Sequence, residues 1–167
     1  MKKSNGLFKL LAGLFVMLLA VPAFAAEITP TRVVEHVDKA VQLILDKGEA
    51  EAFPVLTDPN GEWVDGDLYP FIYDFNGNII AHPNKKLEGK NLMKIKDVKG
   101  TVFAAEFVRL AKSDKGEGWC EYWWPKPDQK EPSLKVAFIK RIPGKDMLVG
   151  VGVYDMTLEE AQKASGR

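Results

Sequence analysis

From residue 69 the chain reads Tyr69-Pro70-Phe71-Ile72-Tyr73-Asp74-Phe75-Asn76-Gly77-Asn78-Ile79-Ile80-Ala81-His82-Pro83, and a few residues later Gly89-Lys90-Asn91. Two apolar runs typical of β-strands meet at Asn76-Gly77, a pair that tolerates the positive φ angles of a tight turn. The second run ends on His82. We therefore predict a hairpin over residues 69–75 and 78–82 that carries polar groups.

The segments around this hairpin alternate between helical and strand patterns. Thr29-Pro30 is typical of a helix start, and apolar residues then recur at helical spacing until Gly48. Further helical patterns cover 49–56, 101–111 and 158–164, and further strand patterns cover 118–124, 134–141 and 147–154. Short loops between the last three strands favour antiparallel pairing. The order predicts an α+β fold, in which a five-stranded antiparallel sheet carries a long N-terminal helix and further helices.

The later segments follow the hairpin in the order of a known family. They are Asp97-Val98-Lys99-Gly100, Gly118-Trp119-Cys120-Glu121-Tyr122-Trp123-Trp124-Pro125, Leu134-Lys135-Val136-Ala137-Phe138-Ile139-Lys140 and Val149-Gly150-Val151-Gly152-Val153-Tyr154. With the hairpin, this pattern resembles the single Cache domains of the second type, which are extracytoplasmic PAS-like modules that bind small ligands. The resemblance implies a PAS-like fold. Receptors of that family continue into a transmembrane helix and a cytoplasmic output domain, and we expect neither here.

The N-terminal residues have the three parts of a secretory signal. Lys2, Lys3 and Lys9 accompany an apolar run over residues 10–21, and Ala23-Phe24-Ala25 is an A-x-A cleavage site. The apolar run is shorter than the roughly 20 residues that span a bilayer, and retention as an anchor is the alternative left open. We predict a signal peptide at 1–25, one ligand-binding domain over 26–167, a periplasmic location, and no transmembrane helix in the mature chain.

The composition argues against several classes of protein. Basic and acidic residues balance at 23 each, and cleavage removes three lysines, so the mature chain has no basic excess for binding nucleic acid. With 46% hydrophobic residues the chain is not of the disordered type. Cys120 is the one cysteine, which excludes an intrachain disulfide and a cysteine-based zinc or haem site. No nucleophile, base and orienting group can be named together, so we expect no enzyme, no cofactor and no metal.

Strand alternation indicates where a pocket lies. On the last strand Gly150, Gly152 and Tyr154 share one face, and the missing side chains leave room either for a small molecule or for a tightly packed helix. Lys135 shares a face with Ala137 and Ile139, where a lysine needs an escape to water or an anionic partner. The resemblance favours the partner, because Cache domains commonly present a basic residue here to a ligand carboxylate.

Three further residues complete the predicted site. His82 either donates to the same carboxylate or is a loop hydrogen-bonder. Tyr122 and Trp124 share a strand face, and we expect them to wall the pocket. The predicted ligand-binding residues are Lys135, His82, Tyr154, Tyr122 and Trp124.

The ligand that we expect is a small organic anion. The resemblance suggests a short acid such as pyruvate or lactate, with a membrane receptor or transporter as the partner of the protein. The alternative is a periplasmic interaction module that binds no small ligand.

Overall fold

The computed structural model describes residues 28–167, and the predicted signal peptide lies outside this range. The elements are α1 (Pro30–Lys47), α2 (Glu49–Leu56), β1 (Pro70–Asp74), β2 (Ile79–Ala81), the 3-10 helix η1 (Lys85–Leu87), α3 (Phe103–Lys112), β3 (Glu117–Pro125), β4 (Pro132–Arg141), β5 (Met147–Tyr154) and α4 (Leu158–Ser165). Every predicted helix and strand is present with ends within two residues of the prediction, whereas η1 was not predicted.

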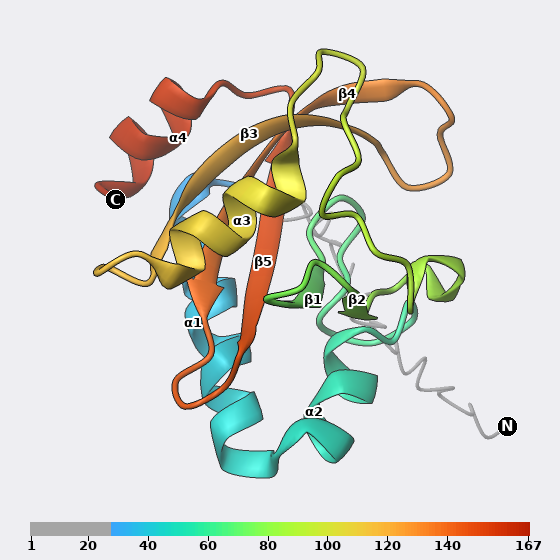
Figure 1. Cartoon of the computed structure of the whole chain (residues 1–167), viewed down its shortest axis with the longest axis vertical. Helices are drawn as coiled ribbons and strands as arrows, with labels where there is room; N and C mark the ends of the chain where they lie inside the picture. The colour runs from blue at the N-terminus through green and yellow to red at the C-terminus, as the bar shows by residue number, and fades with distance from the viewer. Residues whose placement is uncertain (1–27) are drawn as a thin grey trace, which may run out of the picture.

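The five strands form one antiparallel sheet in the order β2-β1-β5-β4-β3. Helices α1, α2 and α4 pack on one face of this sheet, and α3 packs on the other (Figure 1). The predicted α+β, PAS-like arrangement is therefore confirmed. None of the helices within residues 28–167 is long and apolar enough to cross a membrane.

The long first helix is defined by its ends and its stripe. The Thr29 hydroxyl accepts a hydrogen bond from the Arg32 amide, and Pro30 occupies the first turn, where its missing N–H is not needed. A buried stripe faces the sheet, comprising Val33, Val34, Val37, Ala40, Val41 and Ile44. At Gly48 the backbone turns to a φ of 78°, and α2 begins at the next residue.

The β1–β2 hairpin closes as its sequence predicts. Asp74 accepts hydrogen bonds from the amides of Asn76 and Asn78 at 2.9 and 2.8 Å, which holds the turn. Gly77 has a φ of 82°, and a Cβ there would lie 2.8 Å from the Cβ of Met93, so both conformation and space favour glycine. This turn sets the register that places His82 just beyond the end of β2.

Side chains alternate between the two faces of the sheet along the central strands. On β4, Val136 and Phe138 pack toward α1, whereas Ala137 and Ile139 pack toward α3. On β3, Trp119 lies on the α1 side and Cys120 and Tyr122 lie on the α3 side. Lys135 consequently points to the α3 side of the sheet.

Candidate ligand-binding site

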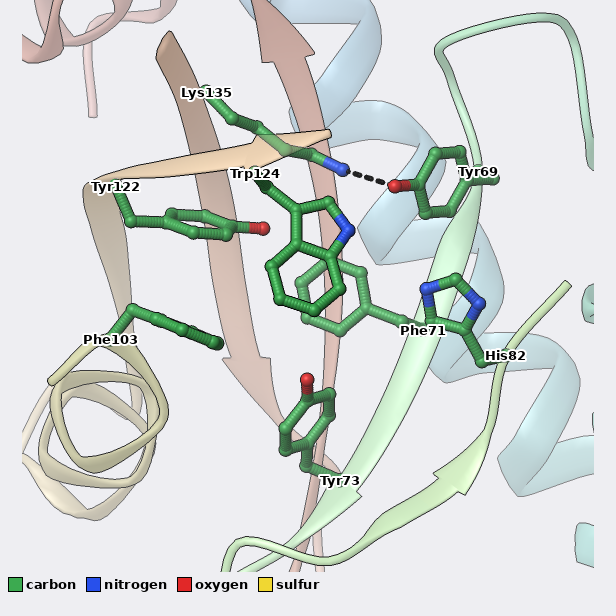
Figure 2. Close-up of a pocket in the computed structure, with 8 residues that line it drawn as sticks. All are labelled: Tyr69, Phe71, Tyr73, His82, Phe103, Tyr122, Trp124 and Lys135. Carbon is green, nitrogen blue, oxygen red and sulfur yellow. Dashed lines mark hydrogen bonds between the residues drawn. The ribbon is translucent and has the colours of Figure 1, made fainter. Parts of the chain in front are cut away.

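A small pocket lies on the α3 side, between β1, the end of β2, α3, β3 and β4 (Figure 2). It encloses about 10 Å³, about the space of one water molecule. Eight residues line it: Tyr69, Phe71, Tyr73, His82, Phe103, Tyr122, Trp124 and Lys135. The lining combines aromatic rings with one ammonium group, one imidazole and three phenols.

Lys135 is the charged group of the pocket and is only 1% exposed. Its Nζ donates a hydrogen bond to the Tyr69 hydroxyl at 2.8 Å and lies 4.0 Å from the centre of the Tyr69 ring and 4.7 Å from that of Tyr154. Within residues 28–167 it takes part in no ion pair, and burial lowers its pKa. The escape to water that the sequence left open does not occur. Phenol and π contacts hold the ammonium group, and the carboxylate of Asp67 acts on it only from beyond ion-pair distance.

Tyr154 stands behind Tyr69 and does not line the pocket. Its hydroxyl lies 3.2 Å from that of Tyr69 and donates to the carbonyl oxygen of Pro125 at 2.8 Å. Of the predicted ligand residues it is the one that the structure places next to Lys135 but outside the pocket lining. Its role there is to hold Tyr69 and to supply a π face to the ammonium.

His82 presents one defined tautomer to the pocket. The amide of Asn84 donates to its Nδ1 at 2.8 Å, so the proton of the neutral ring lies on Nε2. Burial, assisted by the charges of Lys135 and Lys85, lowers the pKa of His82 to about 3, and the ring is therefore neutral at pH 7. Figure 2 shows this ring directed from β2 into the pocket, where its Nε2–H is a hydrogen-bond donor.

Two phenols converge on the same space. Tyr73 and Tyr122 are 4% and 3% exposed, and Figure 2 shows both hydroxyls turned inward. Within the described range neither hydroxyl forms a hydrogen bond to another protein group, both border the open space of the pocket, and burial raises the pKa of both residues. Since neither ionises near neutral pH, both remain available as hydrogen-bond donors. Within residues 28–167 no fully buried side-chain oxygen lacks a partner, so both hydroxyls are open to the pocket space, where a ligand would accept from them.

The remaining lining is aromatic wall. The Phe103 ring stacks on Tyr122 with centroids 5.0 Å apart, and Trp124 meets Phe103 edge-on at 5.5 Å. Phe71 stacks against Phe107 of α3 at 5.6 Å. These contacts give the site rigid apolar sides around its polar centre.

The two glycines of β5, Gly150 and Gly152, make room for side chains of the neighbouring strands, which the sequence did not predict. A Cβ on Gly150 would lie 2.2 Å from the ring of Phe71, and one on Gly152 would lie 2.4 Å from Cε of Lys135. The space over them is thus filled by pocket side chains from the neighbouring strands, and neither a helix nor free space for a ligand lies there. The glycines let Phe71 and Lys135 lie flat on the sheet.

Four of the five predicted residues line the pocket together: Lys135, His82, Tyr122 and Trp124. The lining residues that were not predicted are Tyr69, Phe71, Tyr73 and Phe103. The first three alternate as Tyr-x-Phe-x-Tyr along one strand, and this spacing places all three on one face. That pattern was the available signal, whereas the position of Phe103 depends on how α3 docks.

Comparison with proteins of known sequence places these features in a family. Residues 35–166 match the family model described as Cache domain. Over 89 residues, 53% of this chain, it is 35% identical to the sensor histidine kinase MctS of Rhizobium johnstonii, and over 91 residues it is 36% identical to the methyl-accepting chemotaxis protein McpP of Pseudomonas putida. The chain spans only 19% and 16% of these two proteins.

Solved structures agree. A Cache chemosensory domain studied for carboxylic acid recognition aligns with a TM-score of 0.66 at 28% identity, over 75% of this chain and 92% of that one. A methyl-accepting chemotaxis protein from Vibrio parahaemolyticus shares the fold, with a TM-score of 0.63 at 24% identity over 73% and 85% of the two chains. The chain therefore belongs to the Cache domain family, whose members are sensor and ligand-binding domains and not enzymes.

Proposed function

We propose that this protein is a periplasmic sensor domain that binds a short organic acid in the pocket around Lys135. The observation that carries the proposal is the buried ammonium group, which has no carboxylate partner within the described residues. Burying an ion costs several kcal/mol unless it is paired, and a ligand carboxylate would supply the missing charge.

The groups around the ammonium suit the two oxygens of a carboxylate. The Nε2–H of His82 and the hydroxyls of Tyr73 and Tyr122 face the same space as the Nζ of Lys135. A carboxylate accepts about four hydrogen bonds, which this set of donors is able to supply. Charge-assisted hydrogen bonds of this kind are the strongest that a neutral-pH pocket offers.

The walls favour an acid with a short, apolar or weakly polar remainder. The space is about that of one water molecule, so even a short acid would have to push the lining side chains outward, and aromatic rings surround the space on the sides that the donors leave. The similar Cache domain was studied for carboxylic acid recognition, which supports the same ligand class here. Acetate, propionate, pyruvate and lactate are the acids that we would test first.

The partner and the location follow from the relatives by analogy. One relative is a sensor histidine kinase and another is a chemotaxis receptor, and both names describe signalling proteins. The secretory signal that the sequence predicts at 1–25 would deliver the domain to the periplasm. There the acid-bound domain would act with a membrane receptor or transporter.

The test is a thermal-shift and calorimetric screen of these acids on wild type and on Lys135→Met. Methionine keeps an unbranched chain over Gly152 and removes the charge. At a hundred times its dissociation constant, a ligand adds about 2.7 kcal/mol of stability, which raises the melting temperature by roughly 5–10 °C. Loss of a charge-assisted hydrogen bond, worth about 1.5–3 kcal/mol, should weaken binding about ten- to a hundredfold in the variant.

The exposed Lys99 provides the control, because Lys99→Met removes a lysine outside the pocket and should bind the acids as wild type does. The unliganded Lys135→Met protein should melt at or above the wild-type temperature, since an unpaired buried charge has been removed. If no acid stabilises the wild type, or if Lys135→Met responds equally, the acid-sensor proposal fails. The interaction-module alternative would then take its place.

A further inference from the structure

The pocket adjoins a second, larger hollow. This outer cleft has a volume of about 840 Å³ and lies between the β3–β4 loop and the segments that precede β1 and follow β2. Tyr69, His82 and Trp124 line both the pocket and the cleft. These three side chains are therefore the partition between the enclosed site and the open surface.

Two members of the partition are held in place by hydrogen bonds. Tyr69 accepts from the Nζ of Lys135 and contacts the hydroxyl of Tyr154. His82 accepts from the Asn84 amide, and its own amide donates to Glu88 at 3.0 Å. Displacing either ring would break the hydrogen bond that its own side chain makes inside a buried site, where an unpaired polar group is costly.

Trp124 is held differently. Its indole makes the edge contact with Phe103, and within residues 28–167 it takes part in no side-chain hydrogen bond. The side chain is half-buried, and Trp124 is the last residue but one of β3, just before the exposed β3–β4 loop. In Figure 2 the indole lies across the pocket, between Tyr122 and His82. It is the part of the partition that mutation removes at the lowest cost to the polar network.

The cleft behind Trp124 is suited to an alkyl chain. Its lining includes the apolar side chains of Pro59, Val64, Pro83, Leu87 and Pro127, and polar side chains border it at Asn84, Lys86, Lys126, Asp128 and Gln129. An acid whose carboxylate lies at Lys135 and whose tail extends past the position of Trp124 would enter this apolar hollow. Each buried methylene would then contribute about fourfold in affinity.

We propose that Trp124 is a specificity-determining residue, which restricts the site to short acids by closing the pocket against the outer cleft. The inference rests on the proposed function, because it takes the carboxylate to be bound at Lys135. Removal of the indole joins the two hollows. The preferred ligand then changes from a short acid to an acid with a longer alkyl tail.

The experiment measures the affinity of the straight-chain acids from acetate to octanoate by calorimetry. On wild type, affinity should stop rising at three or four carbons. On Trp124→Ala it should continue to rise by about fourfold per methylene, so hexanoate should bind at least tenfold more tightly than to wild type. Acetate should bind the variant severalfold more weakly, because its wall is gone.

Trp123 provides a matched control, because it is the neighbouring tryptophan on the opposite face of β3, half-buried under Lys99 with Nζ 5.1 Å from its ring. Trp123→Ala should keep the wild-type preference. Trp124→Leu, which retains an apolar side chain, should shift the preference in the same direction by a smaller amount and covers the case in which the alanine variant does not fold.

The outcomes separate this inference from the function on which it rests. Binding of short acids by wild type, with an unchanged chain-length profile in both Trp124 variants, would overturn the role of Trp124 and leave the acid sensor standing. A shift of equal size in Trp123→Ala would also overturn it, since the effect would then not depend on the partition. If wild type binds no acid of the series, the proposed function itself fails, and this inference with it.

Discussion

The two faces of the sheet are built from different chemistry. Toward α1 the core is mainly aliphatic, with Val, Ile, Leu and Ala side chains from α1, α2 and α4 around Phe138 and Trp119. Toward α3 the core is much richer in aromatic rings, and this aromatic face also contains a lysine, a histidine and phenol groups. The side chains of the aliphatic face stabilise the fold by apolar packing. The aromatic face buries polar groups, which costs folding free energy that a ligand would restore by pairing with them.

A single strand contributes side chains to both faces, so the difference between the aliphatic and the aromatic core follows from alternate residues of its sequence. Along β4, Val136 and Phe138 alternate with Lys135, Ala137 and Ile139. Since strand side chains point to opposite faces in turn, neighbouring residues serve different purposes. Stability should accordingly respond to one set of positions and ligand binding to the other.

The largest expected effect on stability tests the aliphatic face. Phe138 is fully buried, and its ring packs against that of Trp119 with centroids 5.2 Å apart. Phe138→Ala removes buried apolar surface and leaves a cavity, which costs about 3–5 kcal/mol. Urea denaturation monitored by circular dichroism should show this loss as a lower midpoint at an unchanged slope.

The matched change on the aromatic face is Tyr122→Phe, which removes one inward-facing hydroxyl. It should alter the unfolding midpoint little, because the hydroxyl makes no hydrogen bond to the described protein. It should weaken acid binding by the loss of one hydrogen bond to the ligand carboxylate, worth about 1.5–3 kcal/mol. A Tyr122→Phe protein as unstable as Phe138→Ala would show that the two faces do not divide stability from binding.

An intermediate effect concerns the pH dependence that His82 adds to the aromatic face. The unfolded chain takes up a proton at this residue as the pH falls through about 6.5, whereas the folded protein resists protonation down to about 3. The contribution of His82 to stability is therefore complete above pH 6.5 and is lost progressively as the pH falls toward 3. His82→Asn keeps an acceptor near the position of Nδ1 and removes this titration.

Unfolding midpoints measured at pH 7 and pH 4.5 would test this pH dependence of stability. The wild type should lose more stability than His82→Asn over this interval, by an amount of the order of 1 kcal/mol or more. Glu88 and Asp97, whose pKa values are lowered by hydrogen bonds, are common to both proteins and cancel in the comparison. Equal losses in the two proteins would mean that His82 is not held neutral by the pocket.

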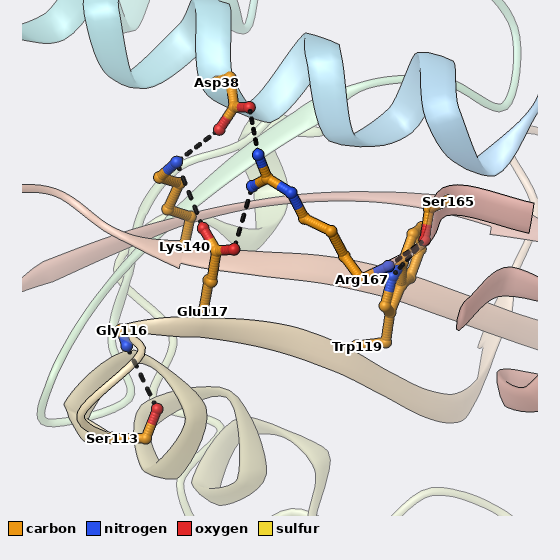
Figure 3. A network of polar contacts seen from close by, with 8 residues as sticks. All are labelled: Asp38, Ser113, Gly116, Glu117, Trp119, Lys140, Ser165 and Arg167. Atoms are coloured by element: carbon orange, nitrogen blue, oxygen red, sulfur yellow. Dashed lines mark hydrogen bonds and ion pairs between the residues drawn. The ribbon is translucent and has the colours of Figure 1, made fainter. Parts of the chain in front are cut away.

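The smallest effect lies at the rim of the aliphatic face, where charged groups join α1 to the strands and to the C-terminal residue (Figure 3). Lys140 bridges Asp38 of α1 and Glu117 of β3, and Arg167 contacts the same two carboxylates. These side chains are 22–41% exposed, so each pair is worth no more than about 1 kcal/mol. Asp38→Asn should lower stability by that amount or less, and the difference should shrink in high salt. A loss above about 2 kcal/mol in the free energy of unfolding would show that this network contributes more than exposed ion pairs do.

The fold was largely predictable from local patterns, because each element carries its own signal. Thr29-Pro30 begins α1, Asn76-Gly77 turns the hairpin, and alternation defines β3, β4 and β5. The same alternation placed Tyr122 and Trp124 on one face of β3, because they are two residues apart on one strand, whereas the pairing of Tyr122 with Lys135 across β3 and β4 came only with the structure. His82 was found because it follows the hairpin directly.

The rest of the site depended on contacts between distant segments. Phe103 lines the pocket because α3 docks over β3, and no local pattern defines that docking. Tyr154 was predicted at the pocket, yet the hydrogen bond of Tyr69 to Lys135 puts Tyr69 in front of it. The prediction that the glycines of β5 leave room above the strand was correct. Which side chains fill that room depends on the lengths of Phe71 on β1 and Lys135 on β4.

The hydrogen bonds that run from Lys135 through Tyr69 and Tyr154 to Pro125 can be followed proton by proton. Tyr154 donates its proton to the Pro125 carbonyl, so in the contact between the two phenols Tyr69 must be the donor. Tyr69 then has no proton left for a ligand, and it accepts from one of the three N–H groups of Lys135. Two ammonium protons remain free to donate to a ligand. An arriving acid would accept from those two, from His82 and from the phenols of Tyr73 and Tyr122. Tyr69 therefore orients the ammonium group of Lys135 and does not itself donate to the ligand.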